Sequence, residues 1–319
     1  MDPPILLAVP NVSDGRDERT IAAVGQAFAD GDAQAGGAGG VPSAGTPVVR
    51  LLDVHSDRDH DRSVFTLAGA ADGLADALLA GARAAVERID VVAPGRKDGS
   101  EPGQHPHVGA VDVVPIVYLE AAARGAACAE ALVVGDRIGA ELGVPVVLYG
   151  ELTADGAGEA RSRAQLRRGG VEGLAARMRD GQTSSDFGPA AMHPSAGATL
   201  VAARPPLVAF NLQLADGATL ADARRIAALV REGGEDGLPG LRAIAVALSG
   251  GVPQVSMNVE RPFDVPLARI VESVGRHAEI ASAELVGLAP REALAGFPAG
   301  VPLLGFDPAR HVIENALGW

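Results

Sequence analysis

The sequence predicts an α/β (α+β) fold of two lobes, each a mixed or antiparallel sheet with helices on one face. Three observations lead to this prediction. The 319 residues are 47% hydrophobic and 21% charged, a globular composition with enough length for two domains. Only 3% are aromatic, so the cores must be built from small aliphatic side chains. Short β-rich runs alternate with helix-length amphipathic segments, which is the order of an α/β protein.

Charge and cysteine content exclude several classes of partner. The chain has 27 Lys and Arg against 40 Asp and Glu, for a net charge of −13, so phosphates of nucleic acids and anionic lipids would repel it. The single cysteine, Cys128, cannot form a disulfide within the chain. The first apolar stretch is too short and too rich in proline for a signal peptide, and no apolar run of membrane-spanning length follows. We therefore expect a cytoplasmic protein that binds neither nucleic acid nor membrane.

The first lobe is predicted to run from residue 1 to 203. Its expected strands are listed here by residue range: 5–9, 48–54, 63–69 and 144–151, with a pair of strands over 108–119 that Pro115 interrupts. Its expected helices cover 17–29, 121–142 and 161–179, together with one that places Leu74, Leu78, Val86 and Ile89 on an apolar face. In the helix over 161–179, the side chains of Leu166, Leu174 and Met178 should point inward.

The second lobe, residues 204–319, is predicted to follow a βαββαβ order. The strands are expected over 207–214, 241–248, 254–260 and 283–288, and the helices over 221–232 and 266–281. This order is typical of a ferredoxin-like sheet with two helices on one face. The glycines of Ser249–Pro253 lie between two of these strands and indicate a hairpin turn.

Simple catalytic motifs are not found. The loop VHSDRDHDR contains His55, His60 and three aspartates, but alternating charge between two strands is more typical of a solvated turn, and no paired-ligand spacing closes a site, so no metal is predicted. The sequence GDAQAGGAGG lacks the lysine and hydroxyl residue of a phosphate loop, and no serine-nucleophile elbow is present.

A set of ordered segments resembles the formiminotransferase domain of glutamate formimidoyltransferases. The segments begin with VPNVSDGRD, LLDVHSDRDHDRSVFTLAG and HPHVGAVDVVPIV, and continue with ELGVPVVLYGE, RRGGVEGL and DFGPAAMHPSAGATLVAARPPLVAFNLQL. QVSMNVERPFDVPL and ELVGLAPREAL extend the likeness into the second half. Several long segments in one order are far more specific than any single motif. The two lobes are accordingly interpreted as the N-terminal and C-terminal formiminotransferase subdomains.

The resemblance implies a function and a mechanism. Tetrahydrofolate, as co-substrate, and a small amino-acid-derived formimidoyl donor would meet in a channel between the lobes, in a cytoplasmic enzyme of one-carbon metabolism and histidine degradation. The family's general base falls on His105, and Asp112 is expected to orient it, although a strand carboxylate beside a loop is as often a cap or turn anchor. Members of the family in animals carry an added cyclodeaminase domain, so a chain ending at Trp319 is expected to act as a transferase alone, with a homodimer as one expected assembly.

Other positions are assigned to binding by the same resemblance. Asn11 and Arg62 match residues that line the cleft, and Arg167 and Arg168 match a basic site that could hold the glutamate tail of folate. The folate-binding loop falls on the following residues: Gly188, Pro189, Ala190, Ala191, Met192, His193, Pro194, Ser195, Ala196 and Gly197. Its glycines are expected to permit close approach of a flat pterin ring.

Two departures from the family pattern leave the substrate open. His107 stands where the family has an arginine, and Ala196 stands where it has a large aromatic residue. Because histidine cannot offer the charged fork of arginine, weak or pH-sensitive use of formiminoglutamate is expected. The hypotheses are a folate-dependent formimidoyl or formyl transferase, a relative with a different donor or acceptor in specialised metabolism, and a folate-binding paralogue without catalysis.

Overall fold

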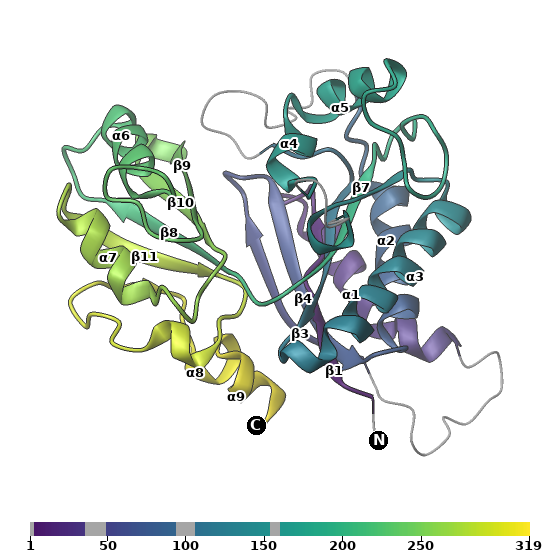
Figure 1. The fold of residues 1–319 in the computed structure, drawn as a ribbon, viewed down its shortest axis with the longest axis horizontal. Coiled ribbons are helices and arrows are strands. Elements are labelled where there is room, and N and C mark those ends of the chain that lie inside the picture. The colour runs from purple at the N-terminus through teal and green to yellow at the C-terminus, as the bar shows by residue number, and fades with distance from the viewer. Residues whose placement is uncertain (1–2, 36–48, 94–105, 154–159) are drawn as a thin grey trace. The chain divides into compact units, whose positions relative to one another are not determined.

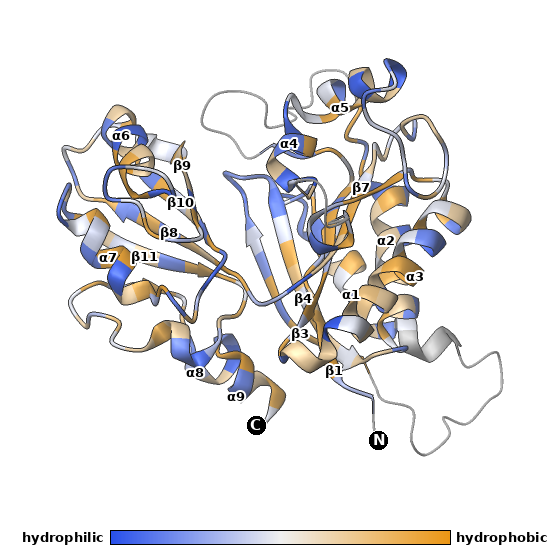
Figure 2. Cartoon of the chain, viewed as in Figure 1, coloured by the Kyte–Doolittle hydropathy of each residue, from blue (hydrophilic) through white to orange (hydrophobic). Residues whose placement is uncertain are grey.

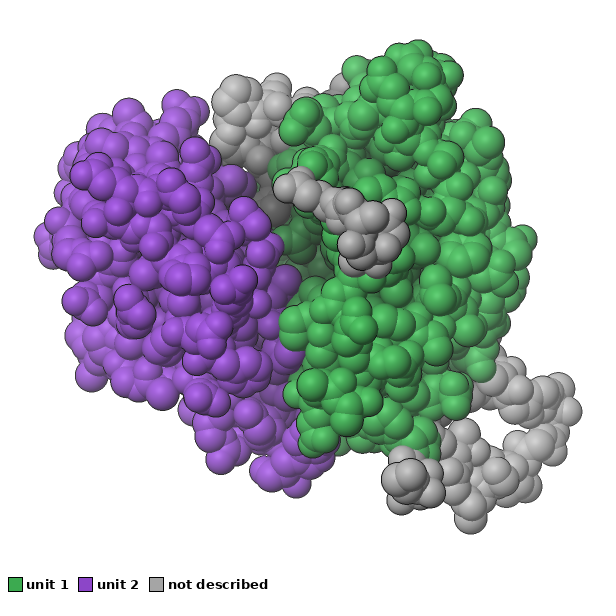
Figure 3. Space-filling model, in the orientation of Figure 1, with its two compact units in different colours: residues 1–205 green, residues 206–319 purple. Residues whose placement is uncertain are grey.

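The computed structural model describes residues 3–35, 49–93, 106–153 and 160–319 (Figure 1). The chain divides into two compact units, residues 1–205 (unit 1) and 206–319 (unit 2), shown in different colours in Figure 3. Each unit contains its own sheet and its own helices, which confirms the predicted α/β class.

Unit 1 is built on a sheet with both parallel and antiparallel pairs. Its strands are β1 (Ile5–Ala8), β2 (Asn11–Val12), β3 (Arg50–Asp57), β4 (Arg62–Ala70), β5 (Val111–Tyr118), β6 (Val146–Leu148) and β7 (Thr199–Arg204). β4 pairs antiparallel with β1, β2 and β3, while β1 and β2 follow one another along the space between β4 and β5. β7 lies between β5 and β6 and runs parallel to both.

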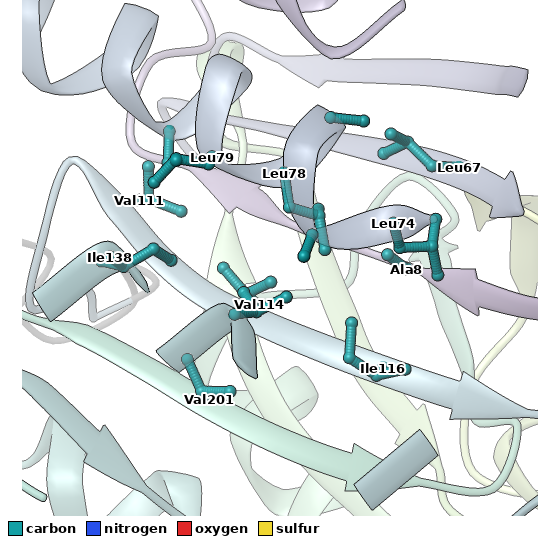
Figure 4. Close-up of a cluster of buried hydrophobic side chains, with 14 of the residues drawn as sticks. Ala8, Leu67, Leu74, Leu78, Leu79, Val111, Val114, Ile116, Ile138 and Val201 are labelled. Atoms are coloured by element: carbon teal, nitrogen blue, oxygen red, sulfur yellow. The ribbon is translucent and has the colours of Figure 1, made fainter. Parts of the chain in front are cut away.

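Three long helices cover one face of this sheet: α1 (Glu18–Ala35), α2 (Leu74–Arg88) and α3 (Arg124–Leu142) (Figure 1). Figure 4 shows the packing that holds them there, with Leu74, Leu78 and Leu79 of α2 clustered with Ile138 of α3 and Val114 of β5. Leu74 and Leu78 are buried, as the apolar spacing predicts. Figure 2 shows hydrophobic residues along α2, α3 and β7.

A second layer covers part of the opposite face. The short helices α4 (Arg163–Arg167) and α5 (Gly170–Arg179) bring Leu166, Leu174 and Met178 into a separate cluster. The cluster includes Val113 of β5 and Leu200 of β7, whereas their neighbours Val114 and Val201 belong to the first cluster. This alternation shows that the parallel strands are buried on both faces. The α/β class is as predicted, but helices cover both faces of the sheet in unit 1 rather than one face.

Three details of unit 1 differ from the prediction. The segment over 108–119 forms one strand, β5, which continues through Pro115. The carbonyl of Pro115 accepts a 3.1 Å hydrogen bond from Val9 N–H. Proline has no N–H of its own, and here this costs the sheet little because the position lies opposite the junction between β1 and β2. The helix over 161–179 is two helices, broken where Gly169 adopts a φ of 76°. The interior strand β7 was not predicted.

Unit 2 confirms the ferredoxin-like order. The strands β8 (Val208–Leu214), β9 (Leu241–Ala247), β10 (Pro253–Val259) and β11 (Ile280–Val286) alternate with the helices α6 (Leu220–Val230) and α7 (Leu267–Gly275) as βαββαβ. The sheet order is β12-β11-β8-β10-β9, and the turn Ser249–Gly251 joins β9 to β10 as a hairpin. The elements after β11 were not predicted: β12 (Leu303–Leu304), α8 (Pro308–His311) and α9 (Ile313–Leu317).

Candidate functional site

Charged side chains gather in unit 1 where β4 and β5 begin. β2 positions them, because Val12 pairs with Ser63 of β4 on one side and with Val111 of β5 on the other. Arg62 and Asp112 are the immediate neighbours of those two residues along their strands. Strand pairing therefore brings the backbones of Asn11, Arg62 and Asp112 close together. These residues come from separate segments of the sequence, and the family resemblance predicts that they belong to one site.

A bulge in β5 turns Asp112 toward the second layer of helices. Asn11 pairs with Val113, but the next residue, Val12, pairs with Val111, so Asp112 is the extra residue. Val111 belongs to the cluster under α1–α3, while Val113 belongs to the cluster under α4 and α5. Bulges commonly redirect one side chain in this way, and here the redirected carboxylate reaches Arg167 on α4.

Asp112 and Arg167 form a buried ion pair. Asp112 Oδ2 accepts a hydrogen bond from Arg167 Nη2, and the two residues are 2% and 4% exposed. Asp112 Oδ1 accepts a 2.9 Å hydrogen bond from Val108 N–H. Both carboxylate oxygens thus have partners in unit 1, and the turn-anchor interpretation of Asp112 is the one that the described contacts support. A role in orienting His105 stays a prediction, because His105 lies outside the described residues.

The local structure around Arg167 holds its guanidinium in place. Ser162 and Gln165 form a capping box at the start of α4. At the other end of α4, Arg177 donates hydrogen bonds of 2.6 Å to the carbonyl of Leu166 and 2.7 Å to that of Arg168. Arg168 itself is exposed. Arg167 and Arg168 are therefore in different environments, one buried and one in solvent, rather than side by side on one surface.

Arg62 lies near both members of the Asp112–Arg167 ion pair and is influenced by the charge of each. Its side chain is partly buried, and among the described residues its guanidinium forms no hydrogen bond or ion pair. Burial, followed by the nearby positive charge of Arg167, lowers the pKa of Arg62 to about 10. The negative charges of Asp112 and Asp57 act in the opposite direction and raise the pKa, and the group is still cationic at neutral pH.

His107 and Asn11 are the other residues that the resemblance assigns to substrate binding, and both lie close to the Asp112 bulge in the chain or in the sheet. His107 is buried, at 8% exposed, one residue before the Val108 N–H that Asp112 accepts. The side-chain amide of Asn11 donates a 3.0 Å hydrogen bond to the carbonyl of Val9, so it closes the junction between β1 and β2.

The loop over 188–197 is fixed by contacts with unit 1 itself. A Cβ on Gly197, which has a φ of 71°, would lie 2.3 Å from the carbonyl oxygen of Val108. A Cβ on Gly188, with a φ of 76°, would lie 2.8 Å from Cα of Gly139 on α3. The glycines are thus required by close approach of the protein's own backbone, and their service to a pterin ring stays a prediction.

Two side chains of this loop also pack against the protein itself, those of His193 and Ala196. His193 Nδ1 accepts a 3.0 Å hydrogen bond from Ala196 N–H, so the imidazole holds the turn. Ala196 is 1% exposed and belongs to the core cluster, so a larger side chain there would enter the core before it could stack on a ligand. The solvent-facing part of the loop consists of Gly188, Pro189, Ala190, Ala191 and Pro194, while Met192, His193 and Ser195 are half-buried.

Within the described ranges, no group of three or more His, Cys, Asp or Glu side chains is arranged to hold a metal ion. The helices in the same ranges include none with the length and apolarity needed to cross a membrane.

Comparison with known proteins places these features in a family. The model of the formiminotransferase domain, N-terminal subdomain, matches residues 5–204. The chain is 34% identical over 320 residues to a glutamate formimidoyltransferase of Streptococcus pyogenes serotype M1, covering 98% of both chains. It is 31% identical over 316 residues to a glutamate formimidoyltransferase of Thermoplasma acidophilum, covering 97% of this chain and 96% of that protein. It is also 35% identical to the formimidoyltransferase-cyclodeaminase of Sus scrofa, covering 90% of this chain and 50% of that longer protein.

Proposed function

Because this chain belongs to the formiminotransferase family, we propose that it is a folate-dependent transferase that moves a formimidoyl group from an N-formimidoyl amino acid, or a formyl group from the N-formyl counterpart, to tetrahydrofolate. The first amino acid to test is glutamate. The observation that carries the proposal is the 34% identity over 98% of both chains to a glutamate formimidoyltransferase. We assign its role to cytoplasmic one-carbon metabolism and histidine degradation. The enzyme class is transferase.

The reaction requires two proton transfers around one carbon. The N5 amine of tetrahydrofolate attacks the amidine carbon of the donor, and the new C–N bond forms as the bond to the glutamate nitrogen breaks. The N5 nitrogen loses a proton, and the departing glutamate nitrogen gains one. We assign both transfers to His105, since a histidine can accept a proton near neutral pH and then return it, a role worth about 10²–10⁴ in rate.

Binding the donor requires local positive charge in an acidic protein. Formiminoglutamate has two carboxylates, while the chain has a net charge of −13. We propose that Arg62 at the start of β4, Arg167 and Arg168 at the end of α4, and His107 supply this charge. Asn11, which is neutral, belongs to the same candidate binding set as a hydrogen-bonding residue. For folate, we propose the loop over 188–197, whose solvent-facing residues are the part left available by its internal packing.

A spectrophotometric assay of folate product tests the proposal. The enzyme is incubated with tetrahydrofolate and, separately, formiminoglutamate, formylglutamate and formiminoglycine, between pH 6 and 8.5. We expect turnover with formiminoglutamate, weak or pH-dependent because His107 replaces an arginine. Turnover with another of the three donors in its place would support the altered-donor relative. Silence with all three contradicts the proposed reaction.

Two further measurements separate catalysis from binding. We expect His105→Ala to lower turnover by about 10²–10⁴ while the affinity for 5-formyltetrahydrofolate, measured by calorimetry, changes little. His107→Ala is the matched comparison. A larger loss of turnover in His107→Ala than in His105→Ala would show that the assignment of the general base to His105 is wrong. Folate binding without turnover by the unaltered protein would favour the non-catalytic paralogue.

A further inference from the structure

The chain that leads into the loop over 188–197 is fastened by Asp186. Its Oδ2 atom accepts a 2.7 Å hydrogen bond from Leu148 N–H, at the end of β6. Its own N–H donates a 2.8 Å hydrogen bond to the carbonyl of Val146. Arg161 Nη2 donates to both carboxylate oxygens, at 2.8 Å to Oδ1 and 2.9 Å to Oδ2. Asp186 therefore ties the chain, two residues before the loop, to β6 and to Arg161.

Arg161 is itself held in place by its backbone. Its carbonyl accepts a 2.9 Å hydrogen bond from Gly150 N–H, and its N–H donates a 3.0 Å hydrogen bond to Thr153 Oγ1. The hydroxyl of Thr153 donates in turn to the carbonyl of Gly150 at 2.9 Å. The next residue, Ser162, is the N-cap of α4. The guanidinium thus extends from a fixed point of the chain, so it can hold Asp186 in a defined position.

The two ends of the loop are held by different kinds of contact. At the far end, the carbonyl of Ala196 accepts a 2.9 Å hydrogen bond from Ala110 N–H, and Ala196 is 1% exposed. At the near end, the side chains of Arg161 and Asp186 are 35% and 26% exposed. Ion pairs in contact with solvent contribute little to global stability. Loss of this pair should therefore loosen the near end of the loop and leave the sheet of unit 1 intact.

The composition of the loop makes the position of its backbone important. The segment GPAAMHPSAG contains no Asp, Glu, Lys or Arg. Its solvent-facing residues, Gly188, Pro189, Ala190, Ala191 and Pro194, carry no polar group in their side chains. They can offer a ligand only backbone N–H and C=O groups and apolar surface. Because hydrogen bonds depend steeply on distance and angle, binding by such a loop depends on where its backbone lies.

We infer that Arg161 and Asp186 are positioning residues for this loop: their ion pair fixes the loop's backbone in the conformation that binds a flat heteroaromatic ligand, and neither side chain contacts that ligand. The identity of the ligand as folate rests on the proposed function. The assignment of the pair rests on the contacts around Asp186. A loop that is ordered before binding loses less conformational freedom on binding, which raises affinity.

The test compares variants of the pair in the full-length protein. The variants are Arg161→Ala, Arg161→Lys, Asp186→Asn and the double variant Arg161→Ala with Asp186→Asn. Asp186→Asn keeps an oxygen that can accept from Leu148 N–H and removes the charge. Arg83→Ala is the matched control, because Arg83 of α2 forms another solvent-exposed ion pair of unit 1, at 3.5 Å from Glu141.

Three quantities are measured for each variant. Calorimetry gives the affinity for 5-formyltetrahydrofolate, and steady-state kinetics gives kcat and the KM values of tetrahydrofolate and of the donor. Hydrogen exchange without ligand, followed by mass spectrometry, reports on the peptide that contains Asp186 and Phe187, whose N–H groups both donate to the carbonyl of Val146. Circular dichroism verifies that each variant folds.

Arg161→Ala should weaken folate binding by about tenfold and raise the KM of tetrahydrofolate by a similar factor, while kcat and the KM of the donor stay within about twofold. Arg161→Lys should recover most of the loss, because a single nitrogen makes both bonds to Asp186. The double variant should be no weaker than Arg161→Ala, since the two residues act as one unit. Exchange in the peptide should be faster in Arg161→Ala and unchanged in Arg83→Ala.

Three results would overturn the inference: unchanged folate affinity in Arg161→Ala, an equal loss in Arg83→Ala, or a loss confined to kcat. If Arg161→Ala does not fold, Asp186→Asn is judged by the same three results. Failure of the proposed function has a different signature, namely no folate binding or turnover by the unaltered protein although exchange still depends on Arg161. In that case the pair holds the loop, but the ligand assigned to the loop is wrong.

Discussion

The two units both join distant segments by a carboxylate and a basic side chain, but the surroundings of the two pairs differ. In unit 1, Asp112 and Arg167 are 55 residues apart in sequence, and their side chains are 2% and 5% exposed. In unit 2, Asp236 and His277 are 41 residues apart, joined at 2.7 Å, and their side chains are 37% and 20% exposed. A buried charge that loses its partner has no water to replace it, whereas an exposed one does. Similar contacts should therefore have very different energetic weight.

Turn glycines show the same contrast. Gly197 in unit 1 and Gly250 in unit 2 both have positive φ, 71° and 81°. A Cβ on Gly197 would meet the backbone of Val108 and Gly109, whereas one on Gly250 would meet nothing within 4 Å. The segments around the candidate site are thus locked by packing, and the hairpin turn of unit 2 is open. Four substitutions test how far this difference extends.

The largest effect is expected for Asp112→Ala, which leaves Arg167 charged and buried. The free energy of unfolding of unit 1 should fall by about 3–5 kcal/mol. Native-state hydrogen exchange, followed separately in peptides of the two units, measures it. Adding Arg167→Met to Asp112→Ala should recover much of the loss, because the unpaired charge is removed. A loss below about 1 kcal/mol in the single variant would show that water reaches the pair.

Gly197→Ala should have the next largest effect, with Gly250→Ala as its matched control. Both introduce a side chain at positive φ, at a cost of about 1–2 kcal/mol. Gly197→Ala also forces backbone apart, which adds about 1–3 kcal/mol. Thermal unfolding of each variant, compared with the unaltered protein, gives the difference. Equal destabilisation at the two glycines would contradict the distinction between a packed and an open turn.

Glu130 tests the burial of a carboxyl group that forms no ion pair with any residue the structure describes. From α3 it accepts hydrogen bonds from the N–H groups of Ala75 at 2.8 Å and Asp72 at 2.9 Å, which cap the start of α2. Glu130→Ala should lower the free energy of unfolding by about 1–3 kcal/mol, because buried donors lose their acceptor. Chemical denaturation of the two proteins is compared at several pH values.

The pH dependence at Glu130 has a defined sign. Burial raises the pKa of its carboxyl group above the ordinary value of about 4.3. The stabilising contribution is therefore complete below that value and is lost as the pH rises through the folded-state pKa. The deficit of Glu130→Ala should be largest near pH 4 and shrink toward neutral pH. A deficit that grows with pH would mean that the hydrogen bonds outweigh burial.

The smallest effect is expected for Asp236→Ala in unit 2. Because its pair with His277 is in contact with solvent, the free energy of unfolding should change by less than about 1 kcal/mol. Urea denaturation of the variant and the unaltered protein, in low and high salt, measures the change. If Asp236→Ala lowered the free energy of unfolding as much as Asp112→Ala, solvent exposure would not explain the difference between the two ion pairs.

Unit 2 was the easier part to predict from the sequence. Its strands alternate apolar and polar residues, as in β8, where Val208, Phe210 and Leu212 enter the core. Its helix α6 begins at a capping box of Thr219 and Asp222. Each signal is local, so the βαββαβ order can be read from consecutive residues. The short elements after β11 have no comparable period.

The candidate site in unit 1 depended on contacts that no local pattern contains. The resemblance brought Asn11, Arg62, Asp112 and Arg167 into one set, but it did not show that Arg167 is bonded to Asp112. That pairing needs a bulge in β5, which a single sequence does not reveal, and contact across 55 residues. In contrast, the break between α4 and α5 could have been predicted, because two consecutive glycines, Gly169 and Gly170, often interrupt a helix. The prediction of one continuous helix over 161–179 ignored them.

The position of β7 has a consequence for synthesis of the protein. β7 is the last strand of unit 1 to leave the ribosome, yet it lies between β5 and β6. Until residues 199–204 emerge, β5 and β6 each present an unpaired, apolar edge, and such edges promote association with other chains. The sheet of unit 1 is therefore complete only after its last-made strand has inserted between two strands that were made earlier. A nascent chain that stalls before Thr199 exposes the kind of surface that chaperones cover.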